Sequence, residues 1–144
     1  MSKAIENLIK AQQFAISVRP KTGGFPYLAE ALKQEGVIKN IWNLPSCQSI
    51  YLTKYGSVVT PGMPLVNTTA DIAIFDRDAL IKAIKVDQAG ESSFPEFLKS
   101  AWEAGVISYV VDFEQRIVTY YGVCNESYSE NYPAVELKKL HNSI

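Results

Sequence analysis

Cys47 is the one side chain that we consider as a nucleophile in this sequence, and it lies in the segment Pro45-Ser46-Cys47-Gln48. A reactive thiol needs a lowered pKa, usually from a neighbouring base or a helix N-terminus. The one histidine, His141, belongs to the C-terminal tail, which gives little reason to expect a Cys47–His141 pair. We therefore favour a structural interpretation, in which Cys47 is a small, partly buried thiol in a turn.

Metal and cofactor sites have no recognisable pattern here. Cys124 follows Gly122 at the expected end of a strand, where a small apolar filler is the simplest role. Two cysteines and one histidine without Cys-x2-Cys spacing do not predict a zinc site. No Gly-rich phosphate loop and no Ser-centred hydrolase elbow is present. The sequence predicts no metal, no cofactor and no catalytic set, and it leaves enzymatic activity uncertain.

Acidic residues could perform acid/base chemistry if two of them shared one pocket with separated pKa values. A structural role accounts for three of these acids. Asp76 suits a helix cap, and Asp112 and Glu114 suit the solvent side of a turn. A small enzyme using Cys47 or a carboxylate pair therefore remains the alternative hypothesis. The acids considered are Asp71, Asp76, Asp78, Asp112 and Glu114.

Aromatic residues are dense in the last third of the chain. Strands favour aromatic side chains, so core and sheet surface are the first interpretation. The functional alternative is an aromatic pocket whose tyrosine hydroxyls orient a small ligand. Stacking on nucleic acid would need interleaved basic residues, and Arg116 alone lies between Tyr109 and Tyr132. The candidate ligand-binding residues are Ser46, Cys47, Tyr109, Tyr120 and Tyr121.

The elements that must position these residues are duplicated. Residues 25–38 (FPYLAEALKQEGVI) match residues 94–107 (FPEFLKSAWEAGVI) without a gap, at an offset of 69 (94 − 25). Leu-Ile-Lys-Ala precedes both segments, and Tyr-Gly follows both. We expect one domain, 1–144, with internal repeats of approximately 3–66 and 76–135.

The repeats differ in one spacing. Gly36 precedes Tyr55 by 19 residues, whereas Gly105 precedes Tyr121 by 16. This comparison predicts that the first hairpin is three residues longer than the second, around Cys47. Loops held by a rigid scaffold often carry function, which is why Ser46 and Cys47 are included among the candidates.

Hydrophobic spacing predicts the elements of each repeat. Ser93 and Glu96 suggest a capping box before the second Phe-Pro helix, and Gly36 and Gly105 suggest helix ends. The fold class is α+β, with a duplicated helix-helix-strand-strand unit and helices packed on a largely antiparallel sheet. The predicted elements are helices 3–17, 25–35, 77–84, 94–104 and 133–140, and strands 37–43, 49–55, 71–75, 107–113 and 117–123.

Composition bounds the function class. The chain has 144 residues, 47% apolar and 20% charged, which is typical of a globular protein. A net charge of −1 argues against electrostatic binding to nucleic acid or anionic membrane. No apolar run suits a membrane span or a signal peptide, so we expect a cytoplasmic protein with reduced thiols.

Several of these features occur together in a known family. The Phe-Pro helix, the Gly-Val-Ile entry to a strand, the Tyr-Tyr-Gly hairpin end and the Tyr-Pro-Ala-Val-Glu-Leu segment resemble the YdfO-like family. These are small bacterial proteins of unknown function, some labelled phage envelope proteins. The similarity covers most of the chain and is strongest from Phe94 to Leu137. It implies an α+β fold and brings no reaction, cofactor or catalytic residue.

The function that best fits these observations is a non-enzymatic cytoplasmic domain that binds a small molecule or a protein partner. The duplicated architecture and the lack of a catalytic set favour it over the enzyme hypothesis. A homodimer is a further expectation, because hairpin edges in a two-copy sheet are open to pairing.

Overall fold

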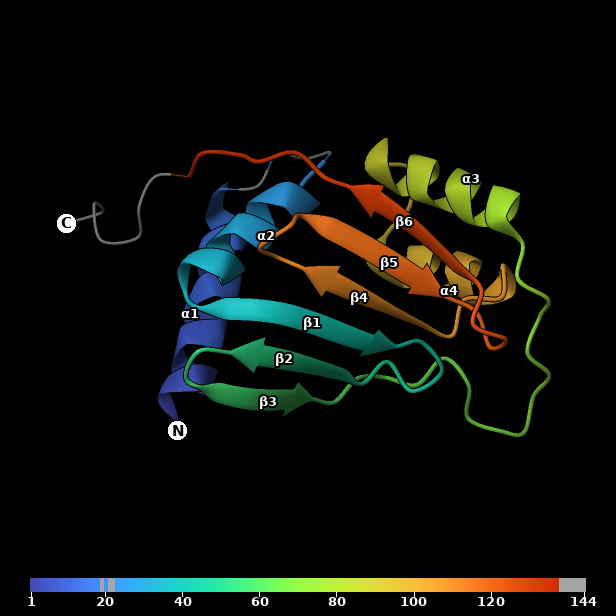
Figure 1. Cartoon of the computed structure of the whole chain (residues 1–144), viewed down its shortest axis with the longest axis horizontal. Helices are drawn as coiled ribbons and strands as arrows, with labels where there is room; N and C mark the ends of the chain where they lie inside the picture. Colours follow the sequence, from blue (N-terminus) through green and yellow to red (C-terminus); the bar gives the residue numbers. More distant parts are fainter. Residues whose placement is uncertain (19, 21–22, 138–144) are drawn as a thin grey trace.

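The computed structural model describes residues 1–18, 20 and 23–137 (Figure 1). Two helices precede three strands, and this order occurs twice along the chain. The elements are α1 (Lys3–Val18), α2 (Phe25–Gln34), β1 (Val37–Asn43), β2 (Ser49–Thr53), β3 (Gly56–Thr60), α3 (Arg77–Gln88), α4 (Phe94–Glu103), β4 (Ser108–Asp112), β5 (Ile117–Tyr121) and β6 (Ser127–Asn131).

The six strands form one sheet in the order β3-β2-β1-β4-β5-β6, and every neighbouring pair is antiparallel. The predicted α+β fold with a largely antiparallel sheet is confirmed. The central strands β1 and β4 join the two halves, with Ile41 opposite Val110. These two residues are also separated by the repeat offset of 69 (110 − 41). A pseudo-twofold axis perpendicular to the sheet therefore passes through this pair.

Helix ends follow the signals in the sequence. Ser93 and Glu96 form both hydrogen bonds of a capping box at the start of α4. The carboxylate of Asp76 accepts the Ala79 N–H at 3.0 Å and caps α3. Gly36 and Gly105 follow α2 and α4 with φ of 94° and 88°, the left-handed region that glycine adopts readily. None of the helices in the described residues is long and apolar enough to cross a bilayer.

Each half has one strand more than the sequence predicted. β3 begins at Gly56, whose φ of 125° permits a tight turn after Thr53. β6 contains the segment Ser-Tyr-Ser-Glu-Asn, which lacks apolar alternation because its edge position leaves it half exposed. The predicted strand 71–75 is wrong, because this segment pairs with no strand. The predicted helix 133–140 is wrong for 133–137, and the rest lies outside the described residues.

The two central hairpins have the same length, so the predicted three-residue difference is wrong. Ile41 faces Ile50 and Val110 faces Thr119, and both pairs are nine residues apart (50 − 41 and 119 − 110). The halves differ instead at the next turn. Thr53 faces Gly56 across two residues, whereas Tyr121 faces Ser127 across five (122–126). The two Tyr-Gly pairs matched in sequence are thus not equivalent in register.

The core lies between one face of the sheet and the helices. Figure 1 looks onto the opposite face, with α1 and α4 behind the strands. Strands β4 and β5 alternate half-buried and buried residues, as expected when one face is covered. The largest fully buried side chains are Phe113, Leu44, Leu80, Val106 and Val111. This arrangement leaves one whole face of the sheet without a helix.

Candidate functional site

The turn between β1 and β2 is built by its own side chains. The Ser46 hydroxyl donates to Asn43 Oδ1 at 2.9 Å and accepts the Gln48 N–H at 3.2 Å. Cys47 has a φ of 55°, and its N–H donates to the Leu44 carbonyl at 3.3 Å. The side chain of Ser46 and the backbone of Cys47 therefore stabilise this turn. This agrees with the structural interpretation of Cys47 that the sequence favoured.

A second loop covers Cys47. The N–H groups of Leu65 and Val66 donate to the Pro45 carbonyl at 3.0 and 3.1 Å. Gly62 lies so close that a Cβ there would overlap the Cys47 carbonyl oxygen. The Cys47 side chain is 7% exposed, and burial raises the pKa of its thiol, an effect that the Leu65 N–H offsets in part. A buried thiol with a raised pKa is poorly suited to nucleophilic attack.

Tyr109 and Tyr120 point into the core as part of an aromatic cluster. Tyr109 stacks on Trp42 with 5.9 Å between ring centroids, and Tyr120 lies 5.7 Å from Tyr109. Phe94 meets Trp42 edge to face at 5.3 Å, and Phe97 meets Tyr120 at 6.3 Å. Burial raises the pKa of Tyr109 and of Tyr120 well above the ordinary value. These rings connect α4 to strands from both halves and pack against one another.

Tyr121 lies on the opposite face, beside Ser108 of β4. The five candidate residues from the sequence therefore occupy three places. Ser46 and Cys47 lie in a turn, Tyr109 and Tyr120 lie in the core, and Tyr121 lies on the face without helices. A role in ligand binding for any of them stays a prediction.

Asp112 lies in the predicted turn, and two further acidic residues were missed by the sequence reasoning. Asp112 accepts the N–H groups of Glu114 and Gln115 at 3.0 and 3.1 Å, as its predicted turn position implies. Burial raises the pKa of Asp87, which accepts a 3.4 Å hydrogen bond from Ser92. The signal for Asp87 was its helical spacing from the buried residues Leu80 and Ile84.

Glu130 is the second addition and lies on β6. Its carboxylate accepts the Tyr128 hydroxyl at 2.6 Å and the Gln88 amide at 3.4 Å. The hydrogen bond from Gln88 joins the edge strand to α3. In the described part of the chain, no group of three or more His, Cys, Asp or Glu side chains could hold a metal ion.

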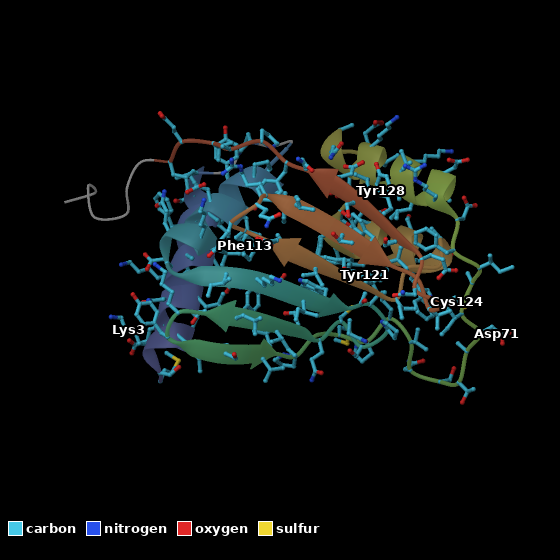
Figure 2. The ribbon with its side chains drawn as sticks, viewed as in Figure 1. Lys3, Asp71, Phe113, Tyr121, Cys124 and Tyr128 are labelled. Carbon is cyan, nitrogen blue, oxygen red and sulfur yellow. The ribbon has the colours of Figure 1, made fainter. Side chains whose placement is uncertain are left out.

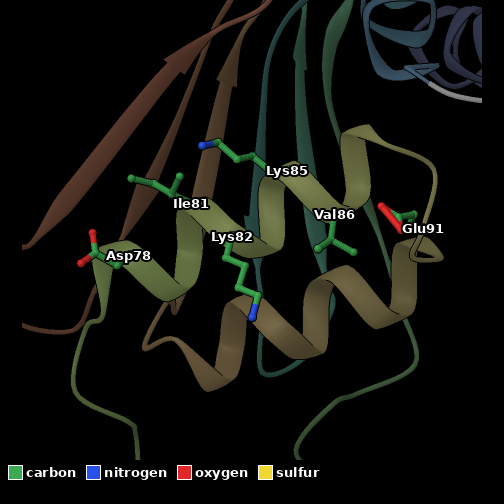
Figure 3. Close-up of a pocket in the computed structure, with 6 residues that line it drawn as sticks. All are labelled: Asp78, Ile81, Lys82, Lys85, Val86 and Glu91. Carbon is green, nitrogen blue, oxygen red and sulfur yellow. The ribbon is translucent and has the colours of Figure 1, made fainter.

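Helix α3 and Glu91, which follows it, line a shallow groove (Figure 3). Its volume is about 380 Å³, and the side chains around it carry both charges. Lys82 extends toward α4, whereas Lys85 extends to the other side of α3 (Figure 3). The lining residues are Asp78, Ile81, Lys82, Lys85, Val86 and Glu91. A ligand with an acidic group could contact the lysines, but the groove would leave most of that ligand in solvent.

The sheet face without helices, which we call the open face, carries three rows of facing side chains: a central row, a flanking row, and a third row of Asn43, Ser108, Tyr121 and Ser127. The central row is apolar over its first four strands and consists of Val59, Ile50, Ile41, Val110, Thr119 and Ser129. The flanking row places two opposite charges between two apolar side chains, in the order Leu52, Lys39, Asp112 and Ile117. It ends on the edge strands at Ser57 and Asn131.

The open face differs from an ordinary solvated sheet face. Antiparallel sheets with one face in water normally alternate apolar and polar residues, with the polar ones outside. Here Val59 is 58% exposed and Ile50 is 39% exposed, and Ile41 and Val110 lie beside them. Part of this pattern was visible in the sequence, where Ile41 lies between the polar residues Lys39 and Asn43 at every second position. The sequence could not show which strands bring such residues together.

Different residues lie at the two ends of the sheet. Figure 2 shows Cys124 and Asp71 at one end of the sheet and Lys3 at the other. Cys124 is exposed in the turn between β5 and β6, where its N–H donates to Glu126 at 2.8 Å. The two free cysteines of the described chain are thus chemically distinct, with Cys47 buried and Cys124 accessible.

Comparison with known proteins identifies relatives of this chain. The family model described as "Protein of unknown function (DUF1398)" matches residues 12–131. The uncharacterized protein Rv2012 of Mycobacterium tuberculosis strain H37Rv is 51% identical over 136 residues, which cover 94% of this chain and 83% of that protein. The uncharacterized protein Mb2035 of Mycobacterium bovis has the same identity and coverage. These descriptions name no reaction, ligand or partner, so the functional argument depends on geometry.

Proposed function

This chain belongs to the DUF1398 family of proteins of unknown function, and from that premise we propose that it is a non-enzymatic protein-binding domain that uses its open face. The observation that carries the proposal is the central row, where four neighbouring strands place Val59, Ile50, Ile41 and Val110 together. Contiguous exposed apolar side chains on a folded protein commonly mark an interaction site.

The arrangement of charge supports a protein partner. Lys39 and Asp112 are the charged side chains among the strand positions of the open face, and they lie side by side. A face with balanced charge and an apolar centre suits another protein surface, in which an apolar core is bordered by polar groups. It is a poor match for a phosphate backbone, which needs clustered positive charge.

The enzyme hypothesis has less support. Cys47 lacks the exposure and the lowered pKa of a reactive thiol. Asp87 is a carboxylate with a raised pKa, but its hydrogen bond to Ser92 is within the connection between α3 and α4. No second carboxylate is hydrogen-bonded to Asp87 in the described part of the chain.

A small-molecule site along α3 is the second candidate. The observation that favours it is the groove of about 380 Å³ with Lys82 and Lys85 beside it. We also propose, from the sequence, a cytoplasmic location and kinship with the YdfO-like proteins.

Site-specific photo-crosslinking in the native host tests the proposed function. A photoreactive phenylalanine analogue replaces Ile50 on the open face or, as the matched control, Lys85 on α3. We expect cross-links to an identified protein from position 50 and few from position 85. The purified partner should then bind Ile41→Lys at least tenfold more weakly than wild type, because a charge at an interface centre is strongly unfavourable. Equal cross-linking from both positions, or unchanged binding by Ile41→Lys, would overturn the proposal.

A further inference from the structure

We infer that the partner on the open face is a second copy of this chain, packed face to face about a twofold axis that runs parallel to the strands between β1 and β4. The inference rests on the proposed function and names its partner. The flanking row carries it, because its order across four strands is Leu52, Lys39, Asp112, Ile117. That order is apolar, positive, negative, apolar.

Rotation about the stated axis reverses the order of strands and preserves the position along them. Lys39 then faces Asp112 of the partner subunit, and Asp112 faces Lys39 of the partner subunit. By the same rotation, Leu52 faces the partner's Ile117, and the reverse contact also forms. In a twofold interface every contact occurs twice, so one self-complementary row supplies two ion pairs and two apolar contacts.

The inner four positions of the central row fit the same axis. Ile41 faces Val110 of the partner subunit, and these two positions lie directly beside the axis. Ile50 faces the partner's Thr119, whose methyl group is apolar and whose shape is β-branched. Stacked sheets pack about 10 Å apart with interdigitating side chains of this size.

Within the described residues, neither charge of the flanking row has an ion-pair partner. In the described residues the one ion pair is Lys10–Glu35, at 3.6 Å, so Lys39 and Asp112 do not neutralise each other within 4.0 Å. Burial of an unpaired charge is costly. An axis that lies in the plane of the sheet, perpendicular to the strands and through the central row, would place Lys39 opposite Asn43 of the partner subunit. Asp112 would then face Ser108 of the partner subunit, so both charges would stay unpaired. The axis parallel to the strands is therefore the one that the charges select.

The open face has room for such an interface. Six strands at about 4.8 Å spacing, with five residues each at about 3.4 Å, span roughly 24 by 14 Å between backbone atoms. Side chains and the flanking turns extend this toward the roughly 800 Å² per partner of a standard interface. We expect a dimer that dissociates on dilution rather than a permanent one.

A charge-swap experiment tests the inference by sedimentation velocity across micromolar concentrations. Wild type should shift from one chain mass to two as concentration rises. Lys39→Asp places two carboxylates opposite each other, and Asp112→Lys places two ammonium groups opposite each other. We expect each variant alone to dimerise at least tenfold more weakly. Mixed in equal amounts they should associate with each other, because both contacts in the mixed pair become attractive.

Lys99→Asp on the exposed surface of α4 is the matched control and should dimerise like wild type. Circular dichroism melts confirm that Asp112→Lys folds, since Asp112 also holds the following turn. A single chain mass at all concentrations would overturn the inference, as would equal effects of Lys39→Asp and Lys99→Asp. If the photo-crosslinks from position 50 reach a different protein while wild type stays monomeric, the inference fails and the proposed function stands. If those cross-links are also absent, both fail.

Discussion

Cys47 illustrates how an apparently reactive residue becomes structural. The thiol lies in a tight turn, its own N–H is bonded to Leu44, and the loop containing Gly62 and Leu65 covers it. Because desolvation raises the thiol pKa, less thiolate is present at a given pH than in an unfolded chain. Cys124 is exposed, so its reactivity can be compared with that of Cys47 in the same protein.

The first prediction follows from this contrast. In the variants Cys124→Ser and Cys47→Ser, a thiol-selective reagent at pH 8 should label Cys47 at least tenfold more slowly than Cys124. The physical reason is the combination of low exposure and a raised pKa. Absorbance of the released chromophore gives both rates. Labelling of Cys47 as fast as in denaturant would restore it as a candidate nucleophile.

Gly62→Ala provides the matched perturbation. The added Cβ would overlap the Cys47 carbonyl, so the covering loop must move. We expect faster labelling of Cys47 in this variant and an unchanged rate for Cys124. An unchanged Cys47 rate would mean that another group, and not this loop, limits access to the thiol.

At the scale of elements, the two helix-to-strand junctions look alike in sequence and differ in surroundings. Gly36 and Gly105 are related by the repeat offset, and both have positive φ. A Cβ at position 36 would meet a flexible ring, Tyr55, at 3.1 Å. A Cβ at position 105 would meet the backbone of Phe75 at 2.6 Å, because the extended segment before α3 passes over that junction.

The second prediction compares these junctions. Gly36→Ala should lower the free energy of unfolding by about 1–2 kcal/mol, the cost of a left-handed conformation for a residue with a Cβ. Gly105→Ala should cost clearly more, because backbone atoms must also move. Urea unfolding measures both, with Ser100→Ala on the exposed surface of α4 as the control. Equal losses at the two glycines would contradict the described position of Phe75.

Local signals predicted some elements and not others. The cap of α3 at Asp76 and the capping box of α4 depend on side chains within one turn, which a sequence displays directly. β6 could not be predicted this way, because its polar side chains carry no apolar alternation and its pairing with β5 defines it. The hairpin comparison failed because Tyr55-Gly56 and Tyr121-Gly122 resemble each other in sequence but not in register.

At the scale of the whole molecule, the sheet order decides what each face can do. The repeat predicted two related halves, and the pairing of Ile41 with Val110 shows how they meet. The flanking row with Lys39 and Asp112 could not be predicted, because it combines residues from four strands whose order the sequence does not contain. The candidate residues chosen by chemical type lie in a turn, in the core and, for Tyr121, on the open face.

The tyrosines buried under the helices make the stability of the protein depend on pH. Burial raises the pKa of Tyr109 and Tyr120 well above the ordinary value, and it raises the pKa of Tyr132 to about 12. The unfolded chain ionises its tyrosines near pH 10. The stability that depends on neutral phenols is therefore complete below about pH 10 and is lost as the pH rises toward the folded values.

The third prediction states the slope of that loss. Above pH 10, each buried tyrosine should lower the free energy of unfolding by about 1.4 kcal/mol per pH unit. Urea unfolding between pH 8 and 11, in a Cys47→Ser background, measures the slope without the thiol. Tyr109→Phe should make the slope shallower, because the unfolded chain then has one phenol fewer to ionise. Phe97→Leu should lower stability equally at every pH, because it removes packing without a titrating group. If Tyr109→Phe keeps the wild-type slope, as Phe97→Leu is expected to do, the Tyr109 hydroxyl must reach water in the folded protein, and the described packing of the aromatic cluster is contradicted.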